Sequence, residues 1–150
     1  MILLKKVFIT GSGSGLGKEA AIRLAQRGHV VYASVHYDNQ VSDLEKISKS
    51  ENLKLEAFKL DILNTSEREK ILNYDIDTFI CNSAIGDSGS VADISIDKIK
   101  NVFETNIFCN LEIIQLALKN MISKGNGRII IISSIVRKNS YAFSISILCI

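Results

Sequence analysis

A glycine-rich segment, TGSGSGLGK at residues 10–18, constrains the fold of this 150-residue chain more than any other feature. An apolar, β-branched run precedes it and apolar residues at helical spacing follow it, which predicts a turn from a buried strand into a helix. Small residues let the backbone approach a phosphate group, and the helix N-terminus supplies unpaired N–H groups and partial positive charge. The segment therefore predicts a phosphate-binding loop, and a glycine-rich turn without a ligand is the alternative.

The spacing inside this loop argues against a P-loop for ATP. A P-loop requires G-x-x-x-x-G-K-[ST], in which the hydroxyl holds magnesium. Here Ser12 stands at the first glycine position and Glu19 at the hydroxyl position. A strict G-x-G-x-x-G also fails, because Leu16 or Lys18 stands at its last position. The loop does follow T-G-x-x-x-G-x-G, which is completed by Thr10, Gly11, Gly15 and Gly17.

The rest of the chain alternates between apolar runs and segments of helical periodicity. Continuous apolar strands, each followed by a helix, indicate a parallel sheet covered on both faces. The predicted fold class is α/β, a Rossmann-like doubly wound parallel sheet of about five strands in the order 3-2-1-4-5, in one domain over residues 1–150. The expected strands are 3–10, 29–35, 53–60, 78–81 and 128–133, and the expected helices are 17–27, 41–50, 64–74 and 95–123.

Composition and charge exclude several classes of partner. A net charge of +2, with no basic run longer than two residues, argues against nucleic acid. The longest uncharged run, 139–150, is about half a membrane span, so we expect no membrane partner. Cys81, Cys109 and Cys149 are widely spaced without a C-x-x-C pair, which favours free thiols in a reducing cytoplasm over a disulfide framework or a metal site.

The glycine loop resembles that of the short-chain dehydrogenase/reductase family, and later segments follow the family's order. The resemblance implies an NAD(P)-binding domain and hydride transfer between a nicotinamide cofactor and a small-molecule carbonyl or alcohol. The residues that it implies for cofactor binding are Gly11, Ser12, Ser14, Gly15, Leu16, Gly17, Ser34, His36, Asp61, Ile62, Asn82, Ser83 and Ala84.

Two of these segments carry specific implied functions. Asp61 matches the aspartate whose side chain contacts the adenine ring, and Ile62 would contribute its backbone N–H. CNSAIG resembles the family's N-N-A-G segment at Asn82 and Ala84, with Ser83 in place of the second asparagine. Asn82 would then brace the sheet and the cofactor loop. Taken alone, Asp61 fits a strand-end turn and Asn82 fits a cap.

The implied catalytic residues are Asn106, Ser134 and Tyr141. Asn106 matches the asparagine of the family's central helix, where a helix irregularity and a water relay protons. Ser134 matches the serine that orients the substrate oxygen, and Tyr141 matches the tyrosine of Tyr-x-x-x-Lys. Ile145 occupies the lysine position, and it cannot hold the ribose or lower the tyrosine pKa. Tyr141 is therefore either catalytic or merely an aromatic residue near the end.

The residues after the second strand favour NADP over NAD. A carboxylate there would accept hydrogen bonds from a ribose 2′-OH, whereas basic residues favour a 2′-phosphate. No carboxylate occurs between Gly28 and Asp38, and His36 could meet a phosphate when protonated.

Three functions remain open at this point. The first is an NAD(P)-dependent oxidoreductase, self-associating through its long helix. The second is a non-catalytic nucleotide-binding pseudoenzyme, and the third is an inactive gene fragment. The sequence carries no sixth and seventh strand and no substrate segment, so we expect a truncated or frame-shifted reading, with the residues after Ile135 outside the original frame.

Overall fold

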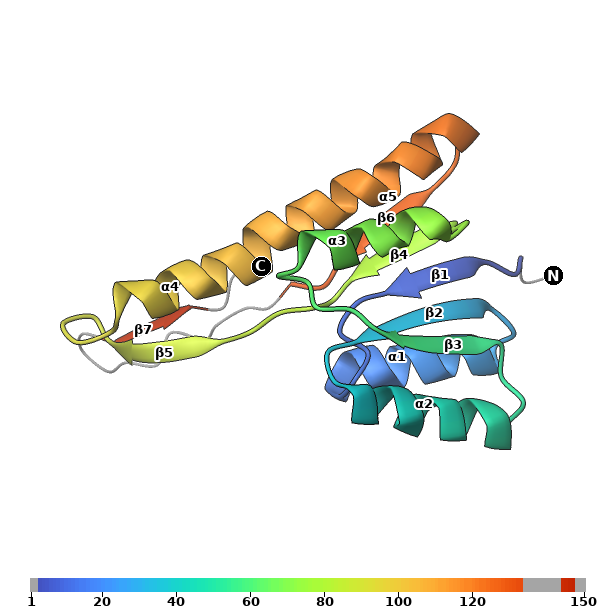
Figure 1. Ribbon diagram of the computed structural model, residues 1–150, viewed down its shortest axis with the longest axis horizontal. Coiled ribbons are helices and arrows are strands. Elements are labelled where there is room, and N and C mark those ends of the chain that lie inside the picture. The colour runs from blue at the N-terminus through green and yellow to red at the C-terminus, as the bar shows by residue number, and fades with distance from the viewer. Residues whose placement is uncertain (1–2, 134–143, 148–150) are drawn as a thin grey trace.

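The computed structural model describes residues 3–133 and 144–147. Its main sheet has five parallel strands in the order β3-β2-β1-β4-β6, which confirms the predicted class and strand order (Figure 1). From β1 the chain continues to β2 and β3 on one side of the sheet, and from β4 it continues to β6 on the other side. The carboxyl ends of β1 and β4 therefore lie side by side at the point where the strand order reverses. The strands are β1 (Lys6–Ile9), β2 (Val30–Val35), β3 (Leu55–Lys59), β4 (Thr78–Cys81) and β6 (Arg128–Ile131).

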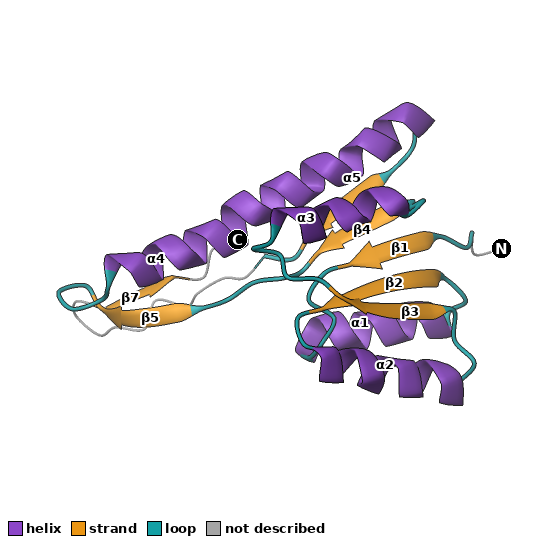
Figure 2. Cartoon of the chain, viewed as in Figure 1, coloured by secondary structure: helices purple, strands orange, loops and turns teal. Residues whose placement is uncertain are grey.

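Helices cover both faces of this sheet (Figure 2). On one face lie α1 (Gly15–Gln26) and α2 (Asp38–Ser50). On the other lie α3 (Thr65–Arg68), the 3₁₀ turn η1 (Glu69–Asn73) and α5 (Asn110–Lys124). A continuous rod joins α4 (Ile96–Phe103), the π-helical segment η2 (Glu104–Cys109) and α5. Within the described ranges, no helix has both the length and the apolar character to cross a membrane.

Alternation along β1 explains the two layers. Val7 and Ile9 point to the face covered by α1, where Ala21 belongs to the same buried cluster. Phe8 points the other way and belongs to the second cluster with Phe79 and residues of α5. Period-2 alternation on a central strand thus builds two cores at once.

Helix ends follow the sequence signals in most places. Gly28 follows Arg27, the C-cap residue of α1, with φ +90°, and Gly125 ends α5 with φ +66°, a region in which glycine is favoured. The predicted helix 64–74 forms in two pieces, one α turn and one 3₁₀ turn. Asn64 caps the first piece, accepting the N–H groups of Ser66 and Glu67 at 3.0 and 3.4 Å.

A small antiparallel ribbon lies outside the main sheet. It pairs β5 (Asp87–Ser90) with β7 (Ser144–Ile147), with Gly89 opposite Ile145, and β5 lies beside α4 (Figure 1). The sequence analysis did not predict β5, because DSGS has no apolar alternation and contains glycine.

We expect Phe8→Ala to lower the free energy of unfolding by about 4 kcal/mol, because the ring is fully buried. It packs against Phe58 and Tyr74 at centroid distances of 5.5 and 5.4 Å. Urea unfolding followed by circular dichroism measures the change. Val91→Ala is the control, since Val91 is 59% exposed in the turn after β5 and should change the value by less than about 0.5 kcal/mol. Equal losses in the two variants would contradict the assignment of Phe8 to the core.

Candidate functional site

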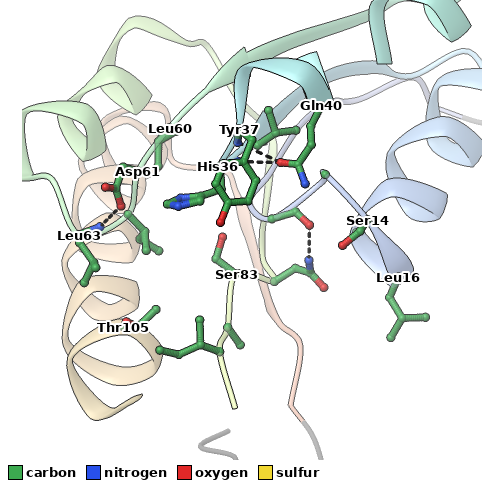
Figure 3. A pocket seen from close by; sticks show the side chains of 18 of the residues that line it. Ser14, Leu16, His36, Tyr37, Gln40, Leu60, Asp61, Leu63, Ser83 and Thr105 are labelled. Atoms are coloured by element: carbon green, nitrogen blue, oxygen red, sulfur yellow. Dashed lines mark hydrogen bonds between the residues drawn. The ribbon is translucent and has the colours of Figure 1, made fainter. Parts of the chain in front are cut away.

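One pocket opens at the carboxyl ends of the central strands, beside the N-terminus of α1 (Figure 3). Its volume of about 540 Å³ lies in the range of small-molecule and cofactor sites. Ten of the thirteen residues predicted to bind a cofactor line it: Gly11, Ser14, Leu16, Gly17, His36, Asp61, Ile62, Asn82, Ser83 and Ala84.

The glycine loop turns β1 into α1 at the rim of this pocket. Gly11 and Gly15 have φ values of +68° and +53°, so the loop relies on backbone conformations that other residues adopt rarely. Ser14 is the N-cap of α1, and within the described structure its side chain makes no capping bond. The first turn of α1 carries no acidic side chain. The N–H groups at this helix end are therefore available to an anionic ligand.

Gly17 lets α1 approach the loop closely. A Cβ atom at Gly17 would lie 2.3 Å from the carbonyl oxygen of Gly11 and 2.4 Å from Nδ2 of Asn82. No side chain fits there without moving the backbone of the loop. The third glycine of the motif thus serves helix packing, and Gly15, with nothing within 4 Å of a Cβ, serves the turn itself.

Thr10 and Asn82 join the ends of β1 and β4. The Thr10 hydroxyl oxygen accepts the backbone N–H groups of Asn82 and Ser83 at 3.0 and 3.1 Å. In return, Nδ2 of Asn82 donates to the carbonyl oxygens of Thr10 and Gly11 at 3.0 and 3.1 Å. Thr10 is completely buried. These bonds fix the glycine loop relative to the neighbouring strand, the brace that the sequence suggested for Asn82.

Ser12 and Ser34 lie beneath the pocket and are almost completely buried. The Ser12 N–H donates to the carbonyl oxygen of Ser34 at 2.8 Å, and both hydroxyls donate to the carbonyl oxygen of Ile9, at 3.2 and 3.5 Å. Their side chains hold the loop on the sheet. Gly15, the third predicted residue outside the lining, lies at the start of α1.

The turn after β3 forms the opposite wall. Oδ1 of Asp61 accepts the N–H of Leu63 at 3.0 Å, and the Asp61 N–H donates to the Glu67 carboxylate at 2.6 Å. Glu67 stands three residues after the N-cap Asn64, the usual position for a reciprocal cap, but its carboxylate binds this turn. Asp61 and Ile62 both line the pocket.

A buried arginine ties that turn to α5. Arg68 is 4% exposed and donates from Nη1 to the carbonyl oxygen of Ile62 at 2.5 Å. Its Nη2 forms an ion pair with Glu112, and Nη1 also approaches Sγ of Cys109 at 3.5 Å. The sequence analysis missed Arg68, because an isolated arginine on a polar helix gives no sign of burial.

Asn106 lies inside the π-helical segment η2 and is 2% exposed. Its carboxamide accepts the N–H of Ile85 at 2.9 Å and donates to the carbonyl oxygen of the same residue at 2.7 Å. Asn110 donates to the carbonyl oxygens of Ser83 and Asn106 at 2.9 and 3.0 Å. The helix irregularity is present, and Asn106 uses its side chain to hold the segment after β4.

The turn between β2 and α2 completes the rim. His36 and Tyr37 line the pocket with their rings edge to face at 4.5 Å, while Asp38 pairs with Lys59 at 3.0 Å. The Gln40 side chain lines the same part of the pocket. A glutamine three residues after an N-cap was the sequence signal that could have identified it.

The sequence analysis missed several residues that line the pocket: Gly13, Val35, Tyr37, Gln40, Leu60, Leu63, Ile85, Asn101 and Thr105.

Two predicted catalytic residues, Ser134 and Tyr141, lie outside the described residues. Ile145, at the lysine position, belongs to β7. In the part of the chain that the structure covers, no group of three or more His, Cys, Asp or Glu residues could hold a metal ion.

We expect Thr10→Val to lower the free energy of unfolding by about 2–3 kcal/mol. Valine keeps the shape of threonine but leaves the N–H groups of Asn82 and Ser83 without their acceptor. Thr10→Ser keeps the hydroxyl and loses one methyl group, which we expect to cost about 1 kcal/mol. Chemical denaturation compares the two. A serine variant less stable than the valine variant would show that the hydroxyl bonds are unimportant.

We expect the Cys81 thiol to resist alkylation at pH 9. Burial raises its pKa from about 9 to about 12, so at pH 9 roughly one folded thiol in a thousand is ionised, against about half in the unfolded chain. The unfolded thiol loses its proton first, so this group lowers the stability of the fold as pH rises from about 9 towards 12. Iodoacetamide labelling with peptide mass mapping, in buffer and in denaturant, gives both rates. Equal rates would contradict the burial of the thiol.

Comparison with known proteins agrees with this geometry. The family model described as short chain dehydrogenase matches residues 5–146. The chain is 30% identical over 146 residues to the ketoacyl reductase HetN of Nostoc sp., covering 93% of this chain and 51% of the relative. It is 29% identical over 144 residues to a diacetyl reductase [(S)-acetoin forming] of Staphylococcus epidermidis, covering 91% and 56%.

A solved structure of an actinorhodin polyketide ketoreductase variant with NADPH superimposes with a TM-score of 0.82 at 23% identity. That match covers 87% of this chain and 53% of the ketoreductase. The chain thus spans about half the length of the relatives that it matches.

Proposed function

Because the chain belongs to the short-chain dehydrogenase family, we propose that it binds a nicotinamide dinucleotide in the pocket beside the glycine loop. The observation that carries the proposal is the uncapped N-terminus of α1, which faces this pocket behind a loop of small residues. A diphosphate fits such a site, since backbone N–H groups and the helix dipole both favour negative charge.

The pocket residues fit the two ends of such a cofactor differently. Asp61 and the backbone of Ile62 form one wall, and they would hold the adenine ring. Gly11, Ser14 and Leu16 border the N-terminus of α1 and would hold the diphosphate. Asn82, Ser83 and Ala84 line the side next to β4 and would hold the nicotinamide half. Ser12, Gly15, Gly17 and Ser34 would act through the shape of the loop.

We favour NADP(H) over NAD(H). The rim after β2 offers His36, Tyr37 and Gln40, and Asp38 is paired with Lys59, so the carboxylate that usually receives a ribose 2′-OH is missing from the lining that the structure describes. The related ketoreductase was solved with NADPH, which supports this preference.

We further propose a small-molecule carbonyl or alcohol as substrate, because the relatives are named as ketoacyl and diacetyl reductases. The bound nicotinamide would supply or accept the hydride. Ser134 and Tyr141 remain the predicted catalytic side chains, and Ile145 cannot provide the charge of a lysine. The carboxamide of Asn106 is engaged with Ile85, so its proposed part is to position the strand end next to the substrate.

Self-association through the long helix is part of the same proposal. Phe108, Leu111 and Ile122 are 53%, 50% and 73% exposed along η2 and α5. A second copy of the chain would cover such apolar side chains.

We expect Leu16→Glu to weaken binding of NADPH about tenfold relative to Leu16→Gln. Leu16 lies in the first turn of α1, is 77% exposed and lines the pocket. A carboxylate there repels a diphosphate, whereas glutamine has the same shape without the charge. The acid also suits a helix N-terminus, so the fold should not lose stability. Fluorescence titration of NADPH, at low and high salt, measures the difference.

Equal affinities of the two Leu16 variants would place the diphosphate elsewhere. Absence of NADPH and NADH binding by the unmodified chain would overturn the cofactor proposal. Binding without NADPH oxidation in the presence of a 3-ketoacyl thioester or diacetyl would overturn the proposed reduction of these carbonyl compounds.

A further inference from the structure

Gln40 occupies an unusual place between the glycine loop and the turn after β2. It lies in the first turn of α2, and its Oε1 accepts the backbone N–H groups of His36 and Tyr37 at 3.2 and 3.0 Å. Both partners are donors, so the oxygen of the carboxamide must be the atom that faces them. The amide nitrogen then has a fixed direction, away from these two N–H groups (Figure 3).

Gly13 makes this position possible. A Cβ atom at Gly13 would lie 2.3 Å from Cδ of Gln40 and 2.4 Å from both Nε2 and Oε1. The carboxamide therefore lies flat against the loop, in space that any other residue at Gly13 would fill. Gly13 and Gln40 both line the pocket, so their contact joins the glycine loop to the turn between β2 and α2. Gly13 is not one of the glycines of the T-G-x-x-x-G-x-G pattern. Its contact with Gln40 is a physical reason why this position is a glycine.

At the turn between β2 and α2, the side chain of Gln40 offers a ligand a hydrogen-bond donor and no free acceptor. The amide nitrogen of Gln40 is a donor, and its oxygen is already used twice. The carboxylate of the same turn, Asp38, is paired with Lys59 at 3.0 Å. A ribose 2′-OH is bound best by an acceptor such as a carboxylate, whereas a 2′-phosphate has only acceptor oxygens and needs donors.

We propose that Gln40 is a specificity-determining residue, which presents its amide nitrogen to the ribose 2′ position and selects a 2′-phosphate over a 2′-hydroxyl. This inference rests on the proposed dinucleotide binding. In this proposal the 2′-phosphate is selected by a neutral hydrogen-bond donor, which backbone bonds hold in place. A basic side chain would instead select the phosphate through its positive charge. Gln40 neither meets the nicotinamide half nor takes part in hydride transfer.

Gln40→Glu tests the inference with almost no change of shape. One carboxylate oxygen can still accept the N–H groups of His36 and Tyr37, while the other replaces the donor by a charged acceptor. We expect the affinity for NADPH to fall at least tenfold and the affinity for NADH to stay or rise. The same reversal should appear between adenosine 2′,5′-bisphosphate and 5′-AMP, which differ in the 2′-phosphate alone.

Asn39→Asp is the matched control, because it makes the same change of charge on the adjacent, exposed residue. Its ratio of NADPH to NADH affinity should move less than threefold. Gln40→Ala removes the donor without adding charge, and it should lower NADPH affinity severalfold without any gain for NADH. Glutamate at the third position of a helix is a favoured residue, so Gln40→Glu should fold, which circular dichroism checks.

Calorimetric titration of the 150-residue chain separates the two proposals. If the unmodified chain binds NADPH and the ratio in Gln40→Glu shifts no more than in Asn39→Asp, the assignment of Gln40 is wrong and the dinucleotide site stands. A preference of the unmodified chain for NADH also overturns the assignment. If neither cofactor binds, both proposals fall.

Discussion

The pocket depends on the hydrogen bonds between Thr10 and Asn82 at the point where the strand order reverses. β1 and β4 pair as far as Ile9 and Ile80. The loops that follow them lead to opposite faces of the sheet, so no ladder of backbone bonds holds these loops together. The Thr10 hydroxyl receives two N–H groups from the segment after β4, and the Asn82 amide returns two bonds to the loop after β1. Four bonds across this gap make one rigid rim out of two loops. The absence of a side chain at Gly17 is what allows the Asn82 amide to reach that position.

The helical rod formed by α4, η2 and α5 positions the two remaining walls. Asn106 and Asn110 bind the backbone of Ile85 and Ser83, while Glu112 and Cys109 meet Arg68, which holds Ile62. A regular α-helix would place these side chains differently, because a π turn inserts one residue and rotates all that follow. Three buried polar atoms find no partner among the described residues: Arg68 Nε, Thr105 Oγ1 and Asn110 Oδ1. They lie on or against this rod, where the buried polar side chains that fix the walls are concentrated.

Most of the fold could be predicted from local pattern, and most of the tertiary contacts could not. Apolar runs and helical spacing gave the five strands and their order, and the glycine spacing gave the bend between β1 and α1. The loop residues show where that reasoning ends. Ser12 and Ser14 are chemically alike and two positions apart, yet Ser12 turns under the loop to Ile9 while Ser14 lines the pocket. Arg68 and Gln40 act through partners distant in sequence or specific to the turn, which no periodicity reveals. β5 lacks any apolar pattern, because its pairing is decided by a segment over 50 residues later.

The electrostatics of the rim follow from backbone rather than from cations. Asp61 is the carboxylate among the described lining residues, and that lining contains neither lysine nor arginine. Attraction for an anion must then come from N–H groups at the start of α1 and from the helix dipole, which are fixed by the fold itself. Fixed backbone dipoles need no reorganisation when a ligand binds. They attract an anion regardless of the charges on the rest of the protein surface. A chain with a net charge of only +2 would hold the diphosphate that we propose through these backbone groups. For that purpose the glycine loop needs close approach and defined turns more than it needs a charged side chain.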